Sequence, residues 1–132
     1  MNAKTKSLRS PLGKARGLGS AKSGTAHWMG QRMTALALIP LTLYVLIGFF
    51  NNAVFGGYSG AMYWLQSPVS ATFTVLALFA GLYHGVAGLQ VVIEDYIHCE
   101  ASKIGALFLV KFFAAALAIL GALSVAKILF GV

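Results

Sequence analysis

Long apolar runs alternate with short polar segments along this chain of 132 residues. Three of the runs are long enough to cross the roughly 30 Å hydrocarbon core of a bilayer, which takes about 20 mostly apolar residues in a helix. Because lipid cannot satisfy exposed backbone groups, such runs are expected to be helical. We therefore predict membrane-spanning helices at 33–50, 68–93 and 104–130.

Prolines and lysines inside the predicted spans indicate where the helices start, bend or approach the membrane surface. Pro68 suits the first turn of a helix, where a missing amide proton costs nothing, and Pro40 favours a kink in the first span. Lys111 lies about two turns into the third span and Lys127 near its opposite end. Both are expected to extend their ammonium groups to the nearer membrane surface.

Composition agrees with lipid as the main surroundings of the chain. Apolar residues make up 58% of the sequence and charged residues only 10%, against roughly a quarter in globular proteins. A single cysteine, Cys99, excludes an intrachain disulfide scaffold. The chain is thus too small and too apolar to be a self-sufficient soluble enzyme.

Positive charge before the first span sets the expected orientation. The net charge is +7, and seven of the ten basic residues precede that span: Lys4, Lys6, Arg9, Lys14, Arg16, Lys22 and Arg32. Such a tail is typical of a topogenic signal at the negatively charged cytoplasmic leaflet. We expect a cytoplasmic amino terminus, an external carboxyl terminus and no nucleic-acid partner.

The segments between the spans fit this orientation. Residues 51–67 carry no charge and are rich in Asn, Gly and Tyr, which predicts an outer loop. Tyr63 and Trp64 would lie there in the interfacial aromatic belt. The connection 94–103 holds all three acids of the sequence and is predicted on the inner side.

These features divide the chain into a basic cytoplasmic tail with an interfacial segment, 1–32, and a three-helix transmembrane anchor domain, 33–132. The tail contains no short apolar stretch typical of a cleavable secretory signal. Its Lys, Arg and Ser content without acids also fits an organellar presequence, although Pro11 and four glycines oppose an amphipathic helix. A multi-pass protein of the bacterial inner membrane is preferred, with the mitochondrial inner membrane as the alternative.

His84 falls near the centre of the second span, where an ionisable side chain is costly and usually has a protein partner. At about 100° per residue, its stripe also carries Gly88, Val91 and Asp95, with Ala77, Ala80, Gly81 and Gly85 on or beside it. Small residues permit a close helix approach or leave room for a flat cofactor. Two interpretations stay open: ligation of haem iron and a hydrogen bond between helices.

His27 does not match His84 in predicted depth. His84 lies about 12 residues, or roughly 18 Å, from the cytoplasmic end of its span, whereas His27 precedes the first span. A second axial haem ligand is therefore expected from another chain. Arg32 either sets topology or binds a haem propionate, to which His27 could add a further donor.

The second span ends in Glu94, Asp95 and Tyr96. Tyrosine is an ordinary interface anchor, and acids often mark where a helix meets water. Alternatively, the Tyr96 phenol donates a hydrogen bond to a quinone carbonyl oxygen, and Asp95 connects the site to bulk protons. Spacing alone favours the anchoring interpretation.

Two motifs extend this picture. The first comprises Ala21-Lys22-Ser23-Gly24, His27-Trp28 and Gln31-Arg32-Met33-Thr34, and the second comprises Leu82-Tyr83-His84, Gly88 and Val91-Val92-Ile93-Glu94-Asp95-Tyr96. With them the chain, from about residue 21 onward, resembles the small hydrophobic membrane anchor subunit of succinate dehydrogenase (respiratory complex II), of the D type. The likeness has an alphaproteobacterial or mitochondrion-like character, and the spacing from the histidine to the Asp-Tyr pair is its more specific part.

The resemblance implies a fold, cofactors and partners. The three helices would pack with those of a large cytochrome b subunit into a haem-containing bundle. A flavoprotein subunit would oxidise succinate in the tricarboxylic acid cycle, and an iron-sulfur subunit would pass electrons to ubiquinone for aerobic respiration. This sequence has neither a flavin-binding glycine fingerprint nor a cysteine cluster, so both groups would belong to partners. The chain would not be an enzyme on its own.

The resemblance also assigns residues. His84 matches the axial ligand of the haem b iron, whose second ligand comes from the large cytochrome subunit. Tyr96 matches the tyrosine that hydrogen-bonds ubiquinone, and Asp95 its acidic neighbour. His27 and Arg32 resemble residues near the haem propionates.

Gln90 departs from the family pattern, because relatives often carry Arg or Trp there, so any charge from that position is absent.

Two other functions remain open. One is a non-catalytic membrane scaffold or assembly protein, in which His84 serves only an interhelical hydrogen bond. The other is the anchor subunit of a fumarate reductase, which works in the reverse direction.

Overall fold

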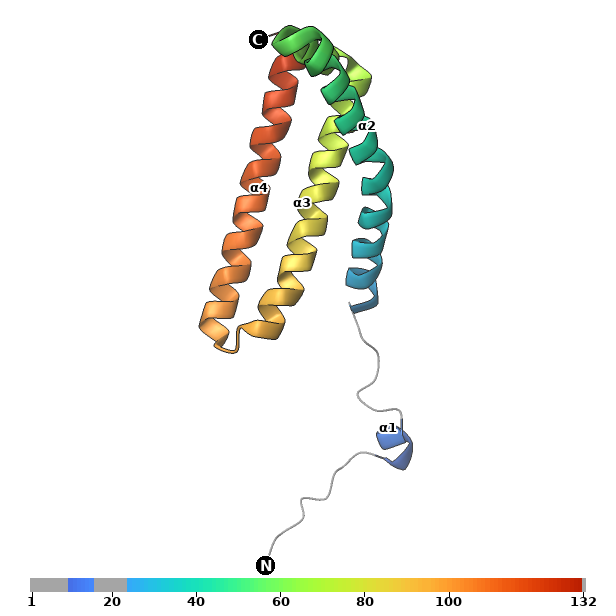
Figure 1. Ribbon diagram of the computed structural model, residues 1–132. Helices are drawn as coiled ribbons and strands as arrows, with labels where there is room; N and C mark the ends of the chain where they lie inside the picture. The colour runs from blue at the N-terminus through green and yellow to red at the C-terminus, as the bar shows by residue number, and fades with distance from the viewer. Residues whose placement is uncertain (1–9, 16–23, 132) are drawn as a thin grey trace, which may run out of the picture.

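The computed structural model describes residues 10–15 and 24–131, and its regular structure within these ranges is entirely helical. The helices are α1 (Pro11–Ala15), α2 (Gly24–Gln66), α3 (Pro68–Tyr96) and α4 (Glu100–Phe130). α3 lies between α2 and α4 and packs against both (Figure 1). Because α2, α3 and α4 are each long and apolar enough to cross a membrane, the predicted all-α fold with three transmembrane helices is confirmed.

The described helices extend beyond the predicted spans. α2 begins at Gly24, nine residues before the predicted start of the first span, and runs through Pro40 without interruption. Ser10 caps α1, where its Oγ accepts the amide hydrogen of Gly13 at 3.1 Å. Residues 1–9 and 16–23, most of the predicted tail, lie outside the described residues, so the tail boundary at residue 32 stays a prediction.

The connection between α3 and α4 is shorter than predicted. α3 continues to Tyr96 and α4 begins at Glu100, which leaves only residues 97–99 between them. The amide of Ile97 closes the last turn of α3 by donating to the carbonyl oxygen of Ile93 at 3.0 Å. Lys111 consequently lies eleven residues, about 16 Å, into its helix rather than two turns.

Small side chains make the contacts between the helices. Among the described residues, the buried ones are Ala61, Leu65, Ser70, Ala71, Ala87 and Ala118. Large apolar side chains such as Leu36 and Phe108 are instead more than 60% exposed. Lipid offers no hydrophobic drive for helix association, so close approach through small residues stabilises such a bundle and leaves the large side chains on its outer surface.

The prediction of a loop at 51–67 is wrong, because α2 continues to Gln66 with a break at Gly57, and the placement of this segment on the outer side stays a prediction. Figure 1 shows the last part of α2 turning toward the carboxyl-terminal end of α4. Ala61 and Leu65, four residues apart, are both buried and form an apolar face on this part of α2. Burial of that face outweighs the loop-like composition of the segment.

The Trp64 side chain packs this last part of α2 against the earlier part of the helix. A side chain at Gly48 would overlap the Trp64 indole, so only glycine permits this approach. The Tyr44 and Phe49 rings lie 5.9 and 6.5 Å from the indole, centroid to centroid. Trp64 is therefore packed within the chain, whereas Tyr63 is 77% exposed, and the predicted place of both in the aromatic belt stays a prediction.

Gly57 bends α2 with a backbone conformation, φ 60° and ψ −152°, that side chains with a Cβ rarely adopt. We expect Gly57→Ala to lower the free energy of unfolding by about 1–3 kcal/mol, the usual cost of such strain. Thermal unfolding of the purified protein measures this. Gly56→Ala is the matched control, since a methyl group there meets open space, and an equal loss in both variants would contradict the role of the bend.

Candidate functional site

His84 is held by the first turns of α2. Its Nδ1 lies 3.2 Å from the main-chain oxygen of Gln31 and 3.4 Å from Oγ1 of Thr34. A carbonyl oxygen only accepts, so in the neutral ring Nδ1 carries the proton and Nε2 keeps its lone pair. A hydrogen bond of this kind fixes the tautomer and orientation of metal-ligating histidines. The ring can therefore bind a further group at Nε2 without losing its contact with α2.

Part of the stripe of small residues around His84 faces α2. A methyl group at Gly81 would contact Leu38, and one at Gly88 would contact the side chain of Gln31. These two contacts are those of a close helix approach, and the use of the stripe beside a flat cofactor stays a prediction. The interhelical hydrogen bond of His84 is also present, and because it uses only Nδ1 it does not compete with iron ligation.

His27 lies closer to the level of His84 than the sequence indicated. It precedes Gln31 by one helical turn, about 6 Å along α2. The predicted depth difference of roughly 18 Å is wrong, because the first helix begins nine residues earlier than its apolar run. His27 is half-buried and does not line the pocket that His84 shares with Arg32.

A small pocket brings Arg32 and His84 together. It is lined by Gln31, Arg32, Ala35 and His84. The Arg32 side chain is exposed, and its guanidinium carbon lies 5.6 Å from the centre of the Trp28 ring, within cation–π range. An imidazole with a free Nε2 beside a guanidinium is a donor set that fits iron and a propionate, respectively.

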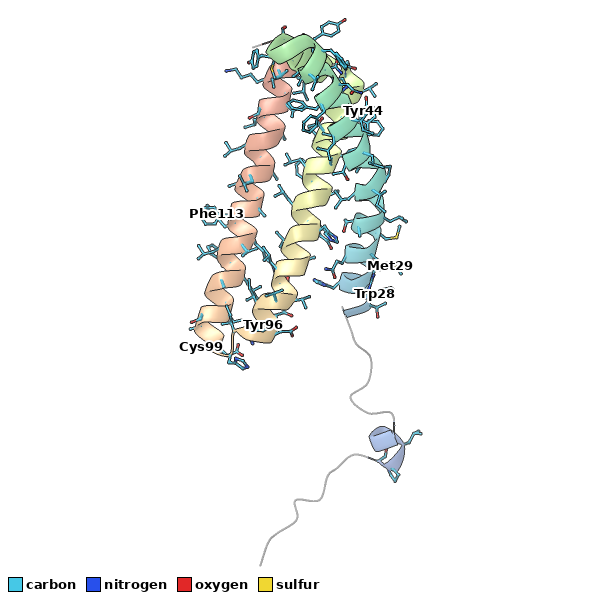
Figure 2. All side chains as sticks on the ribbon, viewed as in Figure 1. Trp28, Met29, Tyr44, Tyr96, Cys99 and Phe113 are labelled. Carbon is cyan, nitrogen blue, oxygen red and sulfur yellow. The ribbon has the colours of Figure 1, made fainter. Side chains whose placement is uncertain are left out.

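Asp95 and Tyr96 lie in the last turn of α3, eleven and twelve residues beyond His84, or about 18 Å along the axis. Figure 2 shows Tyr96 near Cys99, at the end of the bundle where α3 and α4 are joined. Tyr96 is 78% exposed and Asp95 is also exposed. Within the described ranges neither side chain makes a hydrogen bond, so this chain presents both groups without enclosing them.

Gln90 makes a local contact on α3. Its Nε2 donates to Oε1 of Glu94 at 2.8 Å, one helical turn further on. Six residues from His84, Gln90 lies about 120° around the helix from the histidine stripe. Its amide therefore binds an acid of the same helix and does not reach the pocket of Arg32.

The described residues contain no cluster of three or more His, Cys, Asp or Glu side chains that could hold a metal ion.

Comparison with known proteins identifies the family of the chain. Residues 6–122 match the family model described as succinate dehydrogenase/fumarate reductase transmembrane subunit. The chain belongs to this family. No solved structure matches it.

Several succinate dehydrogenase hydrophobic membrane anchor subunits are similar to the chain. That of Rickettsia bellii is 37% identical over 110 residues, covering 83% of this chain and 86% of the relative. That of Paracoccus denitrificans is 30% identical, covering 77% and 78%. The membrane anchor subunit of Reclinomonas americana is 33% identical, covering 68% and 77%. The family resemblance carried by the two motifs is confirmed, and the chain is a membrane anchor subunit of succinate dehydrogenase.

The anchor subunit positions His84 with two groups that the sequence did not single out, the Gln31 carbonyl and the Thr34 hydroxyl. Thr34 also donates to the carbonyl oxygen of Gly30 at 2.8 Å, which holds its side chain against α2. Gly30 in turn lies against the Tyr83 hydroxyl, where a methyl group would clash. Gln31 and Thr34 both belong to the first motif. Only the register of α2 against α3 shows that they contact His84.

Cys99 of the anchor subunit is exposed at the start of α4. The amide and hydroxyl of Ser102, followed by the amide of Ala101, lower the pKa of the Cys99 thiol from its ordinary value. No side-chain hydrogen bond of Cys99 caps the helix, so we attribute this lowering to attraction between the thiolate and the first-turn amides.

Proposed function

We propose that this anchor subunit supplies one axial ligand of haem b and part of the quinone-reduction site in succinate:ubiquinone oxidoreductase. The supporting observation is the bond from His84 Nδ1 to the Gln31 carbonyl oxygen, which leaves Nε2 for iron. Within the described residues, no second imidazole lines the pocket beside His84. The second axial ligand therefore comes from the large cytochrome b subunit on the open side of the pocket.

Other residues of the chain would hold the rest of this cofactor. The Arg32 guanidinium would bind a haem propionate, since it shares the pocket of His84 and makes no described ion pair. His27, one turn earlier in α2, would add a donor nearer the cytoplasmic end. When bound, haem b supplies an iron that stores one electron.

Tyr96 and Asp95 would serve the quinone. The Tyr96 phenol would donate a hydrogen bond to a carbonyl oxygen of ubiquinone, which takes up two electrons and two protons on reduction to quinol. The exposed Asp95 carboxylate would connect this oxygen with protons of the cytoplasm. The electrons come from succinate through the flavin and iron-sulfur clusters of the partner subunits.

The flavoprotein and iron-sulfur subunits would dock at the end of the bundle that carries Tyr96, on the cytoplasmic side of the bacterial inner membrane. The basic amino-terminal tail supports this orientation, since Lys and Arg are retained on that side. The mitochondrial inner membrane, with the matrix in place of the cytoplasm, is the alternative location.

Cys99 provides a test of this orientation. In vesicles washed free of peripheral subunits, a membrane-impermeant maleimide should label Cys99 only from the cytoplasmic side. Because the thiolate is the reacting form, the labelling rate should rise with pH through a midpoint below that of an ordinary thiol. Ser102→Ala should move this midpoint upward. Ser59→Cys in a Cys99→Ser background should label from the opposite side, and labelling of both from one side would overturn the topology.

Purification through a tag on this chain tests the function itself. The proposal expects co-purification of the flavoprotein, iron-sulfur and large cytochrome subunits, with haem b absorption and succinate:quinone reductase activity. The family description also covers fumarate reductases, so catalysis in the reverse direction, from quinol to fumarate, is the second candidate. A much faster fumarate reduction by quinol would favour that candidate, and a colourless preparation that assembles normally would favour a scaffold.

A further inference from the structure

We infer that the end of the bundle opposite Tyr96 carries a binding site for the phosphate group of an anionic phospholipid. A pocket opens there between the last part of α2 and the carboxyl-terminal end of α4. Its lining includes Tyr58, Met62 and Gln66 from α2 and Ser124, Lys127 and Ile128 from α4. This site is independent of the haem and quinone functions proposed above.

The bend at Gly57 builds the α2 side of the pocket. Tyr58, Met62 and Gln66 follow it at intervals of four residues, so they share one face of the last part of α2. The α4 residues likewise recur at spacings of three and four. Two helical faces thus converge on one pocket, and neither helix forms it alone.

Three of the polar groups in this pocket can donate hydrogen bonds. Lys127 brings an ammonium group, Tyr58 a phenol hydroxyl and Gln66 an amide NH₂. The Ser124 hydroxyl donates to the carbonyl oxygen of Leu120 at 2.8 Å and so can only accept from a further group. A cation with neutral donors suits a phosphate diester, whose oxygens accept several hydrogen bonds at once.

Charge distribution along the chain supports an anion at this end. All three acids of the sequence, Glu94, Asp95 and Glu100, lie at the opposite end of the bundle, where α3 meets α4. Lys127 therefore has no carboxylate at its own end within the described residues, and the one described ion pair joins Lys103 to Glu100. A phosphate at Lys127 would pair with this ammonium group.

The apolar surroundings indicate a lipid as the source of the phosphate. Met62 and Ile128 line the pocket beside its polar groups. On α4, Leu117 and Leu120 precede Ser124 and Lys127 on the same face, and both leucines are more than half exposed. They offer an acyl chain a continuous apolar path from the pocket toward the membrane centre, which a free phosphate ion could not use.

Native mass spectrometry of the purified complex, reconstituted with phosphatidylglycerol and phosphatidylcholine in equal amounts, tests this inference. We expect one retained phosphatidylglycerol per anchor subunit, and about tenfold weaker retention in Lys127→Gln, the loss typical of one charge-assisted hydrogen bond. Tyr58→Phe should lose less. Lys103→Gln, which removes a lysine at the other end of the bundle, is the control and should retain the lipid.

Three results would overturn the inference. Retention of phosphatidylcholine as strong as that of phosphatidylglycerol would show that the negative charge of the lipid does not contribute to binding. Unchanged retention in Lys127→Gln would show that the lipid binds at another site. Displacement of the bound lipid by millimolar inorganic phosphate would identify a site for the free anion rather than for a phospholipid. Haem absorption should be the same in all these variants, so failure here leaves the respiratory function untouched.

Discussion

Haem b absorption should disappear from the purified complex when His84 is replaced by leucine. Leucine has no lone pair for iron, and one axial ligand from the large cytochrome subunit cannot maintain a six-coordinate haem. We expect loss of essentially all of the low-spin haem signal in the reduced-minus-oxidised spectrum. The change is expected to be this large because no other described side chain lines the pocket with a free imidazole nitrogen.

Two further variants separate ligation from assembly. Thr34→Val should keep the haem, since the Gln31 carbonyl still holds Nδ1 of His84. His84→Gly leaves a space that added imidazole can fill, so imidazole should restore the spectrum even if the leucine variant assembles poorly. An unchanged low-spin spectrum in His84→Leu would refute the assignment of the axial ligand.

Replacing Tyr96 with phenylalanine should reduce quinone reduction by about 100-fold, the order expected when a donor to a developing oxyanion is removed. Succinate oxidation with an artificial electron acceptor should stay intact, because that electron path ends before the quinone. Both rates are measured on the same preparation, so differences in assembly cancel.

Tyr63→Phe is the matched control for this variant. Tyr63 and Tyr96 are 77% and 78% exposed, and they lie at opposite ends of the bundle. Tyr63→Phe should leave both activities unchanged. If Tyr96→Phe instead lowered both activities equally, the phenol would act on assembly or on succinate oxidation and not on quinone.

Hydropathy predicted the number and order of the membrane helices, because lipid forces long apolar runs into helices. It did not predict where those helices begin. The first turns of α2, from Gly24, carry Thr25, His27, Gln31 and Arg32, so they lack the apolar signal although they are helical. Helical structure needs only local hydrogen bonds, whereas hydropathy reports the surroundings of the side chains.

The segment after Gly57 was missed for a related reason. Its glycines and tyrosines resemble a loop in composition, and only the burial of Ala61 and Leu65 shows an apolar face. That face spans little more than two turns, too short for periodicity to distinguish it from chance. Tertiary packing decides such short helices, and the sequence alone does not record what they pack against.

The sequence named candidate site residues one by one but not their arrangement. His84 and Arg32 were both candidates, and the structure brings them into one pocket. The partner of His84 was not found, because a main-chain carbonyl leaves no trace in the residue type at position 31. Identifying this carbonyl required the register between α2 and α3. Small residues such as Gly30 and Gly81 permit this register but do not determine it.

Anchoring an imidazole to a peptide carbonyl has an evolutionary consequence. Any amino acid at position 31 supplies the same oxygen, so point substitutions there can accumulate while the ring keeps its tautomer. A one-residue insertion or deletion between this position and the α2–α3 contacts further along would instead rotate the oxygen by about 100°. Lineages of this subunit should therefore tolerate drift in identity at position 31 but not drift in length just after it.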